Sequence, residues 1–175
     1  DKIGIGSFGS KLETEAYSLS MYGTKLRDNK TFTDGIIGIS LLDIDHKRIT
    51  YGNILKGNRD GTQIFGSVNL GKRLNDEKFN FNPGIKVDLG YTELAAFREK
   101  TSVGDSLADA LIYKKQKVIS GHATIGVLVD KTVKRNDEKI INHHGRLEYI
   151  ADLSPSSDAE FYYVNSQGTK YKYTV

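Results

Sequence analysis

The chain alternates strictly between apolar and polar side chains over long stretches. Ile85, Val87 and Leu89 point to one side of an extended strand, whereas Lys86 and Asp88 point to the other, because successive strand side chains alternate between faces. The same alternation returns in two further stretches, 123–129 and 146–149. A sheet with one solvated face would show this pattern. So would the wall of a membrane β-barrel, in which apolar side chains meet lipid and polar ones line a wet lumen.

Composition favours an antiparallel β protein with many tight turns. The 175 residues suffice for one domain, and they include 18 Gly, 10 Tyr and 7 Phe but only 2 Pro. The chain has no Cys, which excludes disulfides and thiolate metal sites.

The charge and the apolar runs exclude two broad classes of protein. The formal net charge is only +3, with Lys and Arg interleaved among Asp and Glu, so we expect no nucleic-acid partner. No apolar run approaches the ~20 residues that a transmembrane helix needs, which excludes helical membrane proteins but leaves a barrel open. Asp1 follows no start methionine or leader, so we expect an internal part of a longer protein.

Turn signals divide the chain into roughly eight to ten expected strands. The strand ranges are 2–8, 13–23, 31–44, 62–73, 78–99, 106–119, 121–134, 139–152, 158–165 and 169–175. Residues 45–61 are polar and predict the longest loop, with a short strand at 47–52 and a closing turn at 58–61. Residues 107–118 also fit a helix, but the neighbouring strands favour a strand paired in a hairpin with 121–134. Pro83 predicts a bulge or a membrane-edge position.

Strand length and tyrosine placement favour a membrane barrel over a soluble sheet. Several expected strands are about 10–14 residues long, whereas strands of globular sheets are typically about 5–6. A tilted strand needs about 9–11 residues to cross a bilayer. Tyrosines near strand ends are typical of the aromatic girdles at membrane interfaces.

Short motifs recur along the chain in a characteristic order. They are Ser20-Met21-Tyr22-Gly23, Asp34-Gly35-Ile36-Ile37-Gly38, Arg59-Asp60-Gly61, Phe65-Gly66-Ser67, Leu89-Gly90-Tyr91-Thr92-Glu93-Leu94, Phe97-Arg98-Glu99, Gln116, Gly126, Gly145-Arg146-Leu147-Glu148-Tyr149, Asp152, Ser157-Asp158-Ala159 and Tyr163. Each motif is weak alone, but their order resembles the C-terminal β-domain of bacterial autotransporters over nearly the whole chain.

The resemblance implies an all-β fold, an antiparallel transmembrane β-barrel of 12 strands that enables secretion of its own passenger. Twelve strands of about 10–12 residues need roughly 250 residues, more than the chain has. The chain also stops at Tyr173-Thr174-Val175, without the terminal aromatic of the family. We therefore expect residues 1–175 to form one partial barrel domain of about 8–10 strands, incomplete at both ends.

In this barrel the strand alternation assigns side chains to three environments. The charged residues expected to face the lumen, as a hydrated ion-pair network, are Lys86, Asp88, Glu99, Arg146 and Glu148. Those expected to face lipid are Ile85, Val87, Leu89, Ile125, Val127 and Leu147. The expected interface aromatics are Tyr91, Tyr149, Tyr163, Tyr171 and Tyr173.

Three other motifs carry chemistry on paper, and each has a simpler interpretation. His143 and His144 are adjacent in a strand, point to opposite faces and cannot readily share one metal ion. Ser120-Gly121-His122 lacks an identifiable third member of a nucleophilic triad. Asp43, Asp45 and His46 are better explained as the entry to a loop. We expect no catalytic residue, no cofactor and no metal.

The sequence therefore predicts an outer-membrane translocator barrel of a Gram-negative bacterium that supports secretion of an attached passenger and is not an enzyme. The expected partners are membrane lipid, the passenger and the barrel-assembly machinery. Two alternatives stay open: an outer-membrane barrel enzyme, such as a lipid hydrolase or protease, and a soluble ligand-binding β-barrel.

Overall fold

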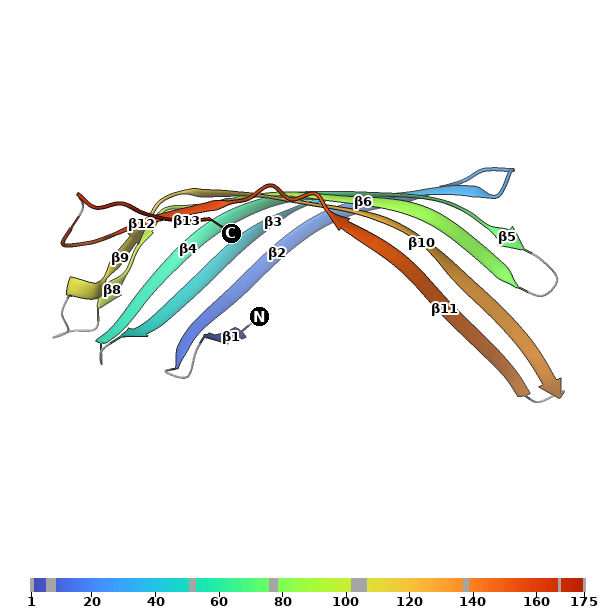
Figure 1. Ribbon diagram of the computed structural model, residues 1–175, viewed down its shortest axis with the longest axis horizontal. Helices are drawn as coiled ribbons and strands as arrows, with labels where there is room; N and C mark the ends of the chain where they lie inside the picture. Colours follow the sequence, from blue (N-terminus) through green and yellow to red (C-terminus); the bar gives the residue numbers. More distant parts are fainter. Residues whose placement is uncertain are drawn as a thin grey trace.

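The chain folds into long antiparallel strands (Figure 1). The computed structural model describes residues 2–5, 9–50, 53–75, 79–101, 107–136, 139–166 and 168–174. Its strands are β1 (Lys2–Ile5), β2 (Ser10–Leu26), β3 (Thr31–Thr50), β4 (Asn53–Lys72), β5 (Leu74–Asn75), β6 (Asn80–Leu94), β7 (Phe97–Arg98), β8 (Lys100–Thr101), β9 (Leu111–Tyr113), β10 (Gln116–Asn136), β11 (Lys139–Asp152), β12 (Asp158–Tyr163) and β13 (Tyr171–Thr174), with one 3₁₀ turn, η1 (Leu107–Asp109).

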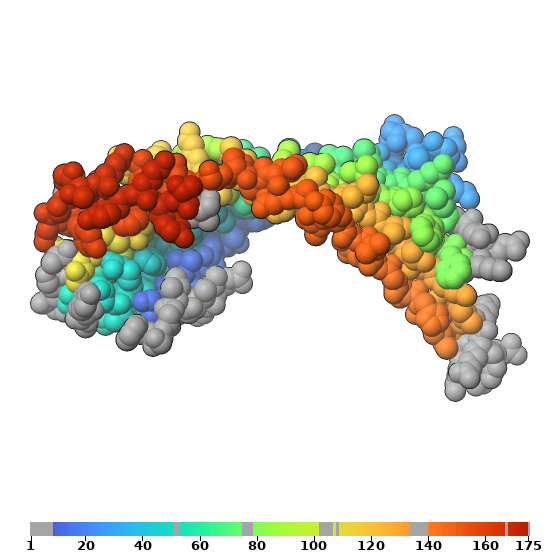
Figure 2. Space-filling model, viewed as in Figure 1, coloured from blue at the N-terminus to red at the C-terminus, as the bar shows by residue number. Residues whose placement is uncertain are grey.

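The strands form two hydrogen-bonded sheets in meander order. The larger sheet has nine strands in the order β1-β2-β3-β4-β6-β10-β11, with β5 beside β6 and β8 beside β4. The smaller sheet has four strands in the order β13-β12-β9-β7. Figures 1 and 2 show that the wall bends into an open arch, with a hollow beneath it. Among the described residues the first and last strands do not pair, so the barrel is not closed.

The two sheets share one strand register. Leu94 lies opposite Gln116, and four residues further along each strand Arg98 lies opposite Ile112. The pairing of β9 with β12 likewise continues the register of β10 with β11. The long strands therefore run through both sheets and bend where β6 passes into β7, β10 into β9 and β11 into β12. Counted this way, the described residues form eight strands, as the sequence predicted.

The buried apolar core is small, which separates this sheet from a soluble sandwich. Its cluster of buried side chains consists of Leu55, Ala110 and Val164, with Ile112 packed against it. Large apolar side chains elsewhere are exposed, for example 77% for Leu19 and 75% for Leu147. A soluble sandwich would bury such side chains under a second sheet, and none of the described segments covers them.

Two sequence expectations about strand ends are wrong. Within the expected loop at 45–61, residues 45–50 are instead the end of β3 and residues 53–61 the start of β4, and these strands pair from Thr31 opposite Lys72 to Thr50 opposite Asn53. The expected break between 119 and 121 is also absent, because β10 runs unbroken through it. This part of β3 and β4 lies beyond the apolar residues of the two strands. Its polar composition therefore resembled that of a loop. By contrast, the strand at 139–152 is confirmed with the same bounds.

The segment that also fitted a helix is mostly extended. It contains the three-residue turn η1, followed by β9 and the start of β10. No described helix has the length and apolar character needed to cross a membrane. Other expected strand ends and turns fall wholly or partly at 6–8, 51–52, 76–78, 106, 137–138, 167 and 175, outside the described residues.

Pro83 interrupts pairing on one side of β6 only. The ladder with β4 stops at Gly71 opposite Gly84 and resumes in β5 at Leu74 opposite Phe81, in the same register. Proline has no N–H to donate, which accounts for the gap. On the other side, β6 and β10 stay in register past Pro83, so the expected bulge is absent.

Glycine makes room for aromatic rings at several cross-strand positions. Phe97 lies where a Cβ on Gly57 would stand, at distances of 2.5 and 2.6 Å from two ring carbons. Phe65 fills the space beside Gly38 in the same way. Such pairs let a curved sheet keep a glycine without leaving a void.

Replacing Gly57 by alanine should therefore destabilise the protein by about 1–3 kcal/mol, because the Phe97 ring must move. The matched control is Gly23→Ala, where an added Cβ meets nothing within 4 Å, and its effect should stay within about 0.5 kcal/mol. Urea unfolding of both variants measures the difference. Equal stabilities would show that the ring has free space beside it.

Candidate functional site

One face of the sheet carries a continuous apolar band. Directly paired residues of antiparallel strands share a face, so the register identifies every member. The band consists of Tyr17, Leu19, Met21 and Gly23 on β2; Gly35, Ile37, Ile39 and Leu41 on β3; Ile64, Gly66, Val68 and Leu70 on β4; Ile85, Val87, Leu89 and Tyr91 on β6; Ile119, Gly121, Ala123, Ile125, Val127 and Val129 on β10; and Gly145, Leu147, Tyr149 and Ala151 on β11. All six residues expected to face lipid lie in this band, together with Tyr91 and Tyr149.

The apolar band crosses the strands obliquely. On β2 it runs from Tyr17 to Gly23. The register leads from Gly23 across β3, β4 and β6 to Ala123 on β10, yet the band on β10 continues to Val129. At the other edge of the band, the register from Tyr17 ends two residues before the start of the band on β10, so the two edges shift by six and by two residues over four strand steps. The mean offset of about one residue per strand corresponds to a strand tilt of about 35°. Membrane barrels have tilts of about 35–45°.

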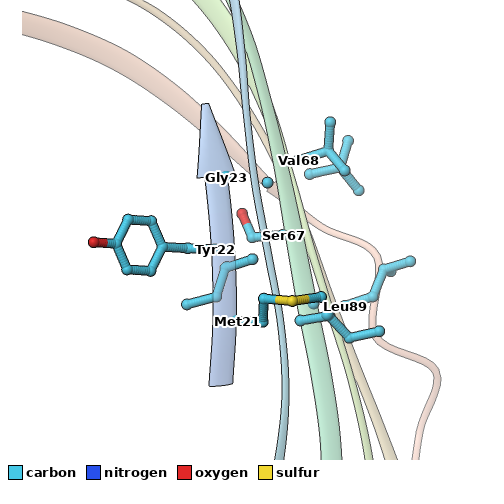
Figure 3. A pocket seen from close by; sticks show the side chains of 11 residues that line it. Met21, Tyr22, Gly23, Ser67, Val68 and Leu89 are labelled. Carbon is cyan, nitrogen blue, oxygen red and sulfur yellow. The ribbon is translucent and has the colours of Figure 1, made fainter. Parts of the chain in front are cut away.

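A shallow groove of about 640 Å³ lies within the apolar band, over β2, β3, β4 and β6 (Figure 3). Three glycines, Gly23, Gly35 and Gly66, form part of its lining. Figure 3 shows Met21 extending towards Leu89, whereas the ring of Tyr22 points to the other side of β2. Large side chains beside glycines thus give this part of the band an uneven surface.

The opposite face is polar and bonded within itself. Two expected lumen pairs are formed between second neighbours on one strand: Lys86–Asp88 at 2.8 Å and Arg146–Glu148 at 2.6 Å. Lys86, Arg146 and Glu148 line one hollow of about 290 Å³, which also reaches Gly126. Charged residues of β6 and β11 therefore line the same hollow, but each ion pair is formed within one strand.

Glu99 differs from the other expected lumen charges because it is fully buried rather than hydrated. Arg48 binds it with two hydrogen bonds, at 2.9 Å from Nε and 2.6 Å from Nη2. The Leu111 N–H donates to the same carboxylate at 2.8 Å, and Arg48 also donates to the carbonyl of Asp109 at 2.6 Å. This ion pair fastens the segment around η1 to β3. His46 lies beside it, 3.5 Å from Glu99.

A row of aromatic rings crosses the polar face beyond the bend. Phe97 and Tyr113 stack at 4.6 Å between ring centroids, Tyr113 meets Phe161 at 5.6 Å, and Phe161 stacks on Tyr171 at 5.7 Å. Tyr163 meets Tyr171 edge-on at 5.7 Å. Two expected interface aromatics therefore belong to this row, whose Phe97 fills the side-chain space of Gly57. Tyr173 is exposed on β13.

Arg59 bonds the backbone where the strands bend. Its guanidinium donates to the carbonyls of Ala95 at 2.7 Å and Lys114 at 3.1 Å, and to the Gln116 side chain at 3.3 Å. At the bend the strands stop pairing, so these backbone carbonyls lose their cross-strand hydrogen bonds. A buried carbonyl without a hydrogen-bond donor destabilises the fold, and Arg59 supplies the donor. The sequence marked this arginine only as part of the Arg59-Asp60-Gly61 motif and did not indicate its contacts, since its partners lie on other strands.

The register also places His122 directly between two carboxylates. Asp88 lies opposite it on β6 and Asp152 opposite it on β11. Ser120, the nucleophile considered from the sequence, is a mid-strand residue and not a turn residue. No hydrogen bond joins Ser120 to His122 among the described residues.

The paired histidines behave as strand alternation predicts. His144 binds Asp130 at 2.6 Å on the polar face, whereas His143 lies opposite Lys131 on the other face. Asp43 and Asp45 accept hydrogen bonds from Asn58 within the wall, not at a loop entry. Within the described part of the chain, no three His, Cys, Asp or Glu side chains are placed to hold a metal ion.

Comparison with known proteins agrees with this geometry. The family model "Autotransporter beta-domain" matches residues 1–175. A search of curated proteins finds no match. The apolar band, its tilt and the family match together show that the chain belongs to the autotransporter beta-domain family, whose members are outer-membrane translocator barrels that support passenger secretion.

Proposed function

We propose that the polar face of this wall lines the passage for the passenger and that the apolar band meets the lipid of the bacterial outer membrane. The observation that carries this proposal is the continuous apolar band on one face of six neighbouring strands. Apolar side chains outside and polar ones inside are what a barrel needs in order to hold water within a bilayer.

The charges of the polar face suit a passage that does not retain its cargo. The pairs Lys86–Asp88 and Arg146–Glu148 neutralise each other within the wall. A wall without a strong field of one sign neither holds nor repels a passing segment of either charge. We propose that passage is mechanical and needs no catalysis by this domain.

The open arch needs further strands to close. An unpaired sheet edge in lipid leaves backbone N–H and C=O groups without partners, each at a cost of several kcal/mol. We propose that strands of the same protein outside residues 1–175 complete the barrel, and that the barrel-assembly machinery inserts it. The passenger belongs to the same protein.

Labelling of single cysteines tests which face meets lipid, because the natural chain has no Cys. Thr124 and Ile125 are adjacent on β10 and point to opposite faces. In membranes, a charged water-soluble maleimide should label Thr124→Cys, and a lipid-soluble reagent should label Ile125→Cys. A bulky adduct at Thr124→Cys should reduce passenger display at the cell surface, whereas the same adduct at Ile125→Cys should not.

The opposite result has an equally clear meaning. Equal labelling of both positions by the charged reagent would show that the apolar band is in water, as in a soluble ligand-binding barrel. Hydrolysis of lipid or peptide by the purified protein, lost in His122→Ala, would instead favour an outer-membrane enzyme. If an adduct at Thr124→Cys left passenger display unchanged, the proposal that the polar face lines the passage would be wrong.

A further inference from the structure

The segment that contains η1 and β9, residues 107–113, is attached to β3 through the buried ion pair of Arg48 and Glu99. We call it the η1 segment. Arg48 donates to the Asp109 carbonyl at 2.6 Å while it binds both oxygens of the Glu99 carboxylate. Glu99 in turn accepts the Leu111 N–H at 2.8 Å, and its own N–H donates to the Leu111 carbonyl at 2.9 Å. The attachment of the η1 segment to β3 therefore depends on the contact between Arg48 and Glu99.

A histidine with an unused ring nitrogen lies against this ion pair. His46 precedes Arg48 by two residues on β3, so both side chains point to the polar face. Its Nδ1 is buried 3.5 Å from the Glu99 carboxylate and has no hydrogen-bond partner among the described residues. The rings of Phe97 and Tyr113 meet the imidazole edge-on, at 6.1 and 6.4 Å between centroids. A neutral imidazole suits such a site better than an imidazolium, because burial without a full set of partners disfavours charge.

The charged groups around His46 also disfavour a proton on it. The charged and titratable groups that face it are Arg48 of β3, Arg59 of β4, whose guanidinium lies over the Phe97 ring, Tyr113 of β9 and Glu99, whereas β2 places the apolar Leu12 opposite it. His46 also lines a hollow of about 1220 Å³, whose cations are Lys11, Lys47, Lys56, Arg98 and Lys100 and whose carboxylates are Glu13 and Asp45. Burial lowers the pKa of His46 below its usual value, and the opposing effect of Glu99 does not compensate.

We propose that His46 makes the attachment of the η1 segment sensitive to pH: protonation of its ring places a second cation beside Arg48 against the Glu99 carboxylate, and the segment detaches from β3. The sign follows from linkage. The attached state binds a proton on His46 less readily than the detached state does, so the attachment is strongest above the usual pKa of histidine, about 6.5, and weakens as the pH falls below it. Histidine is the side chain whose usual pKa lies in this range.

The site lies outside the apolar band, on the face that lines the proposed passage. His46 is five residues beyond Leu41, the last member of the band on β3. Ala110 of the η1 segment is fully buried in the cluster with Leu55, which lies opposite Arg48 on β4. In the proposed function, acid would therefore loosen the wall at one mouth of the passage. The attachment itself does not depend on which face meets lipid, so it can be tested separately.

Hydrogen exchange of the full-length protein that carries this domain gives the test. Rates are measured by mass spectrometry in neutral detergent at about pH 7.5 and about pH 5.5, a range in which ordinary carboxylates stay ionised. After correction for the intrinsic pH dependence of exchange, the η1 segment should exchange at least about threefold faster at the lower pH. Residues 35–41 of β3, within the apolar band, should show no such change and serve as the internal reference.

Two variants identify the titrating group. His46→Asn keeps a neutral side-chain amide near the position of Nδ1, so the acid effect on the η1 segment should disappear. His144→Asn removes an exposed histidine that binds Asp130 on the polar face, and it should leave the acid effect unchanged. If His46→Asn does not fold, the natural protein still decides the question, because the midpoint of its exchange profile should lie in the histidine range and not near the usual carboxylate values of about 4.

Three outcomes would overturn the proposal. Exchange of the η1 segment that is the same at both pH values would show that its attachment does not respond to acid. An equal acceleration in His46→Asn, or a midpoint in the carboxylate range, would assign the response to another group. Slower exchange in acid would show that protonated His46 strengthens the contact with Glu99.

Discussion

Replacing Arg48 by methionine should lower the free energy of unfolding by about 3–5 kcal/mol. The carboxylate of Glu99 is fully buried, and Arg48 binds both of its oxygens. Removing the guanidinium leaves a buried carboxylate that has lost its cation but still accepts a hydrogen bond from the Leu111 N–H, with His46 3.5 Å away. Urea unfolding of the membrane-inserted protein measures the loss.

The matched control is Arg146→Met, which breaks an equally short ion pair on an exposed side chain. Exposed pairs contribute at most about 1 kcal/mol, so this variant should change stability little. Adding Glu99→Gln to Arg48→Met should recover part of the loss, because no buried charge remains. Similar effects from Arg48→Met and Arg146→Met would mean that water reaches Glu99.

Replacing Val87 by lysine should cost about 2–4 kcal/mol of folding free energy in a bilayer. Val87 lies near the middle of the apolar band on β6, so its side chain meets the hydrocarbon in the proposed orientation. In a soluble barrel the same substitution at a solvent-accessible site would lower the folding free energy less, because the lysine would be hydrated. Unfolding from lipid vesicles gives the value.

The control for Val87→Lys is His122→Lys, on the polar face of β10. Its new ammonium lies opposite Asp88 and Asp152, so its stability should change little. Equal costs for the two lysines would show that the faces do not differ in environment. A larger cost for His122→Lys would reverse the proposed orientation.

The alternation of single strands was predictable because it is a local property. A side chain's face depends only on its parity along an extended backbone, so Ile85, Val87 and Leu89 could be grouped before any partner strand was known. The strand at 139–152 was bounded by clear turn residues on both sides. The family resemblance rested on the same local motifs, and the match over residues 1–175 confirms it.

Local composition misled where the wall extends past the apolar band. The polar residues at 45–50 and 53–61 are strand residues, because the backbone hydrogen bonds between β3 and β4 form whatever the side chains are. The bends where β6 passes into β7 and β10 into β9 also could not be predicted from the sequence. They are stabilised by Arg59, whose two carbonyl partners are 36 and 55 residues away.

The sequence by itself determined which side chains share a face within a strand, since this follows from neighbours along the chain. Only the tertiary structure decided which charges meet: Glu99 with Arg48 across 51 residues, and Lys11, Lys47, Lys56 and Lys100 in one row. The physical reason is register. Hydrogen bonding between strands fixes which residues stand opposite each other, and a shift of one residue would exchange every such partner.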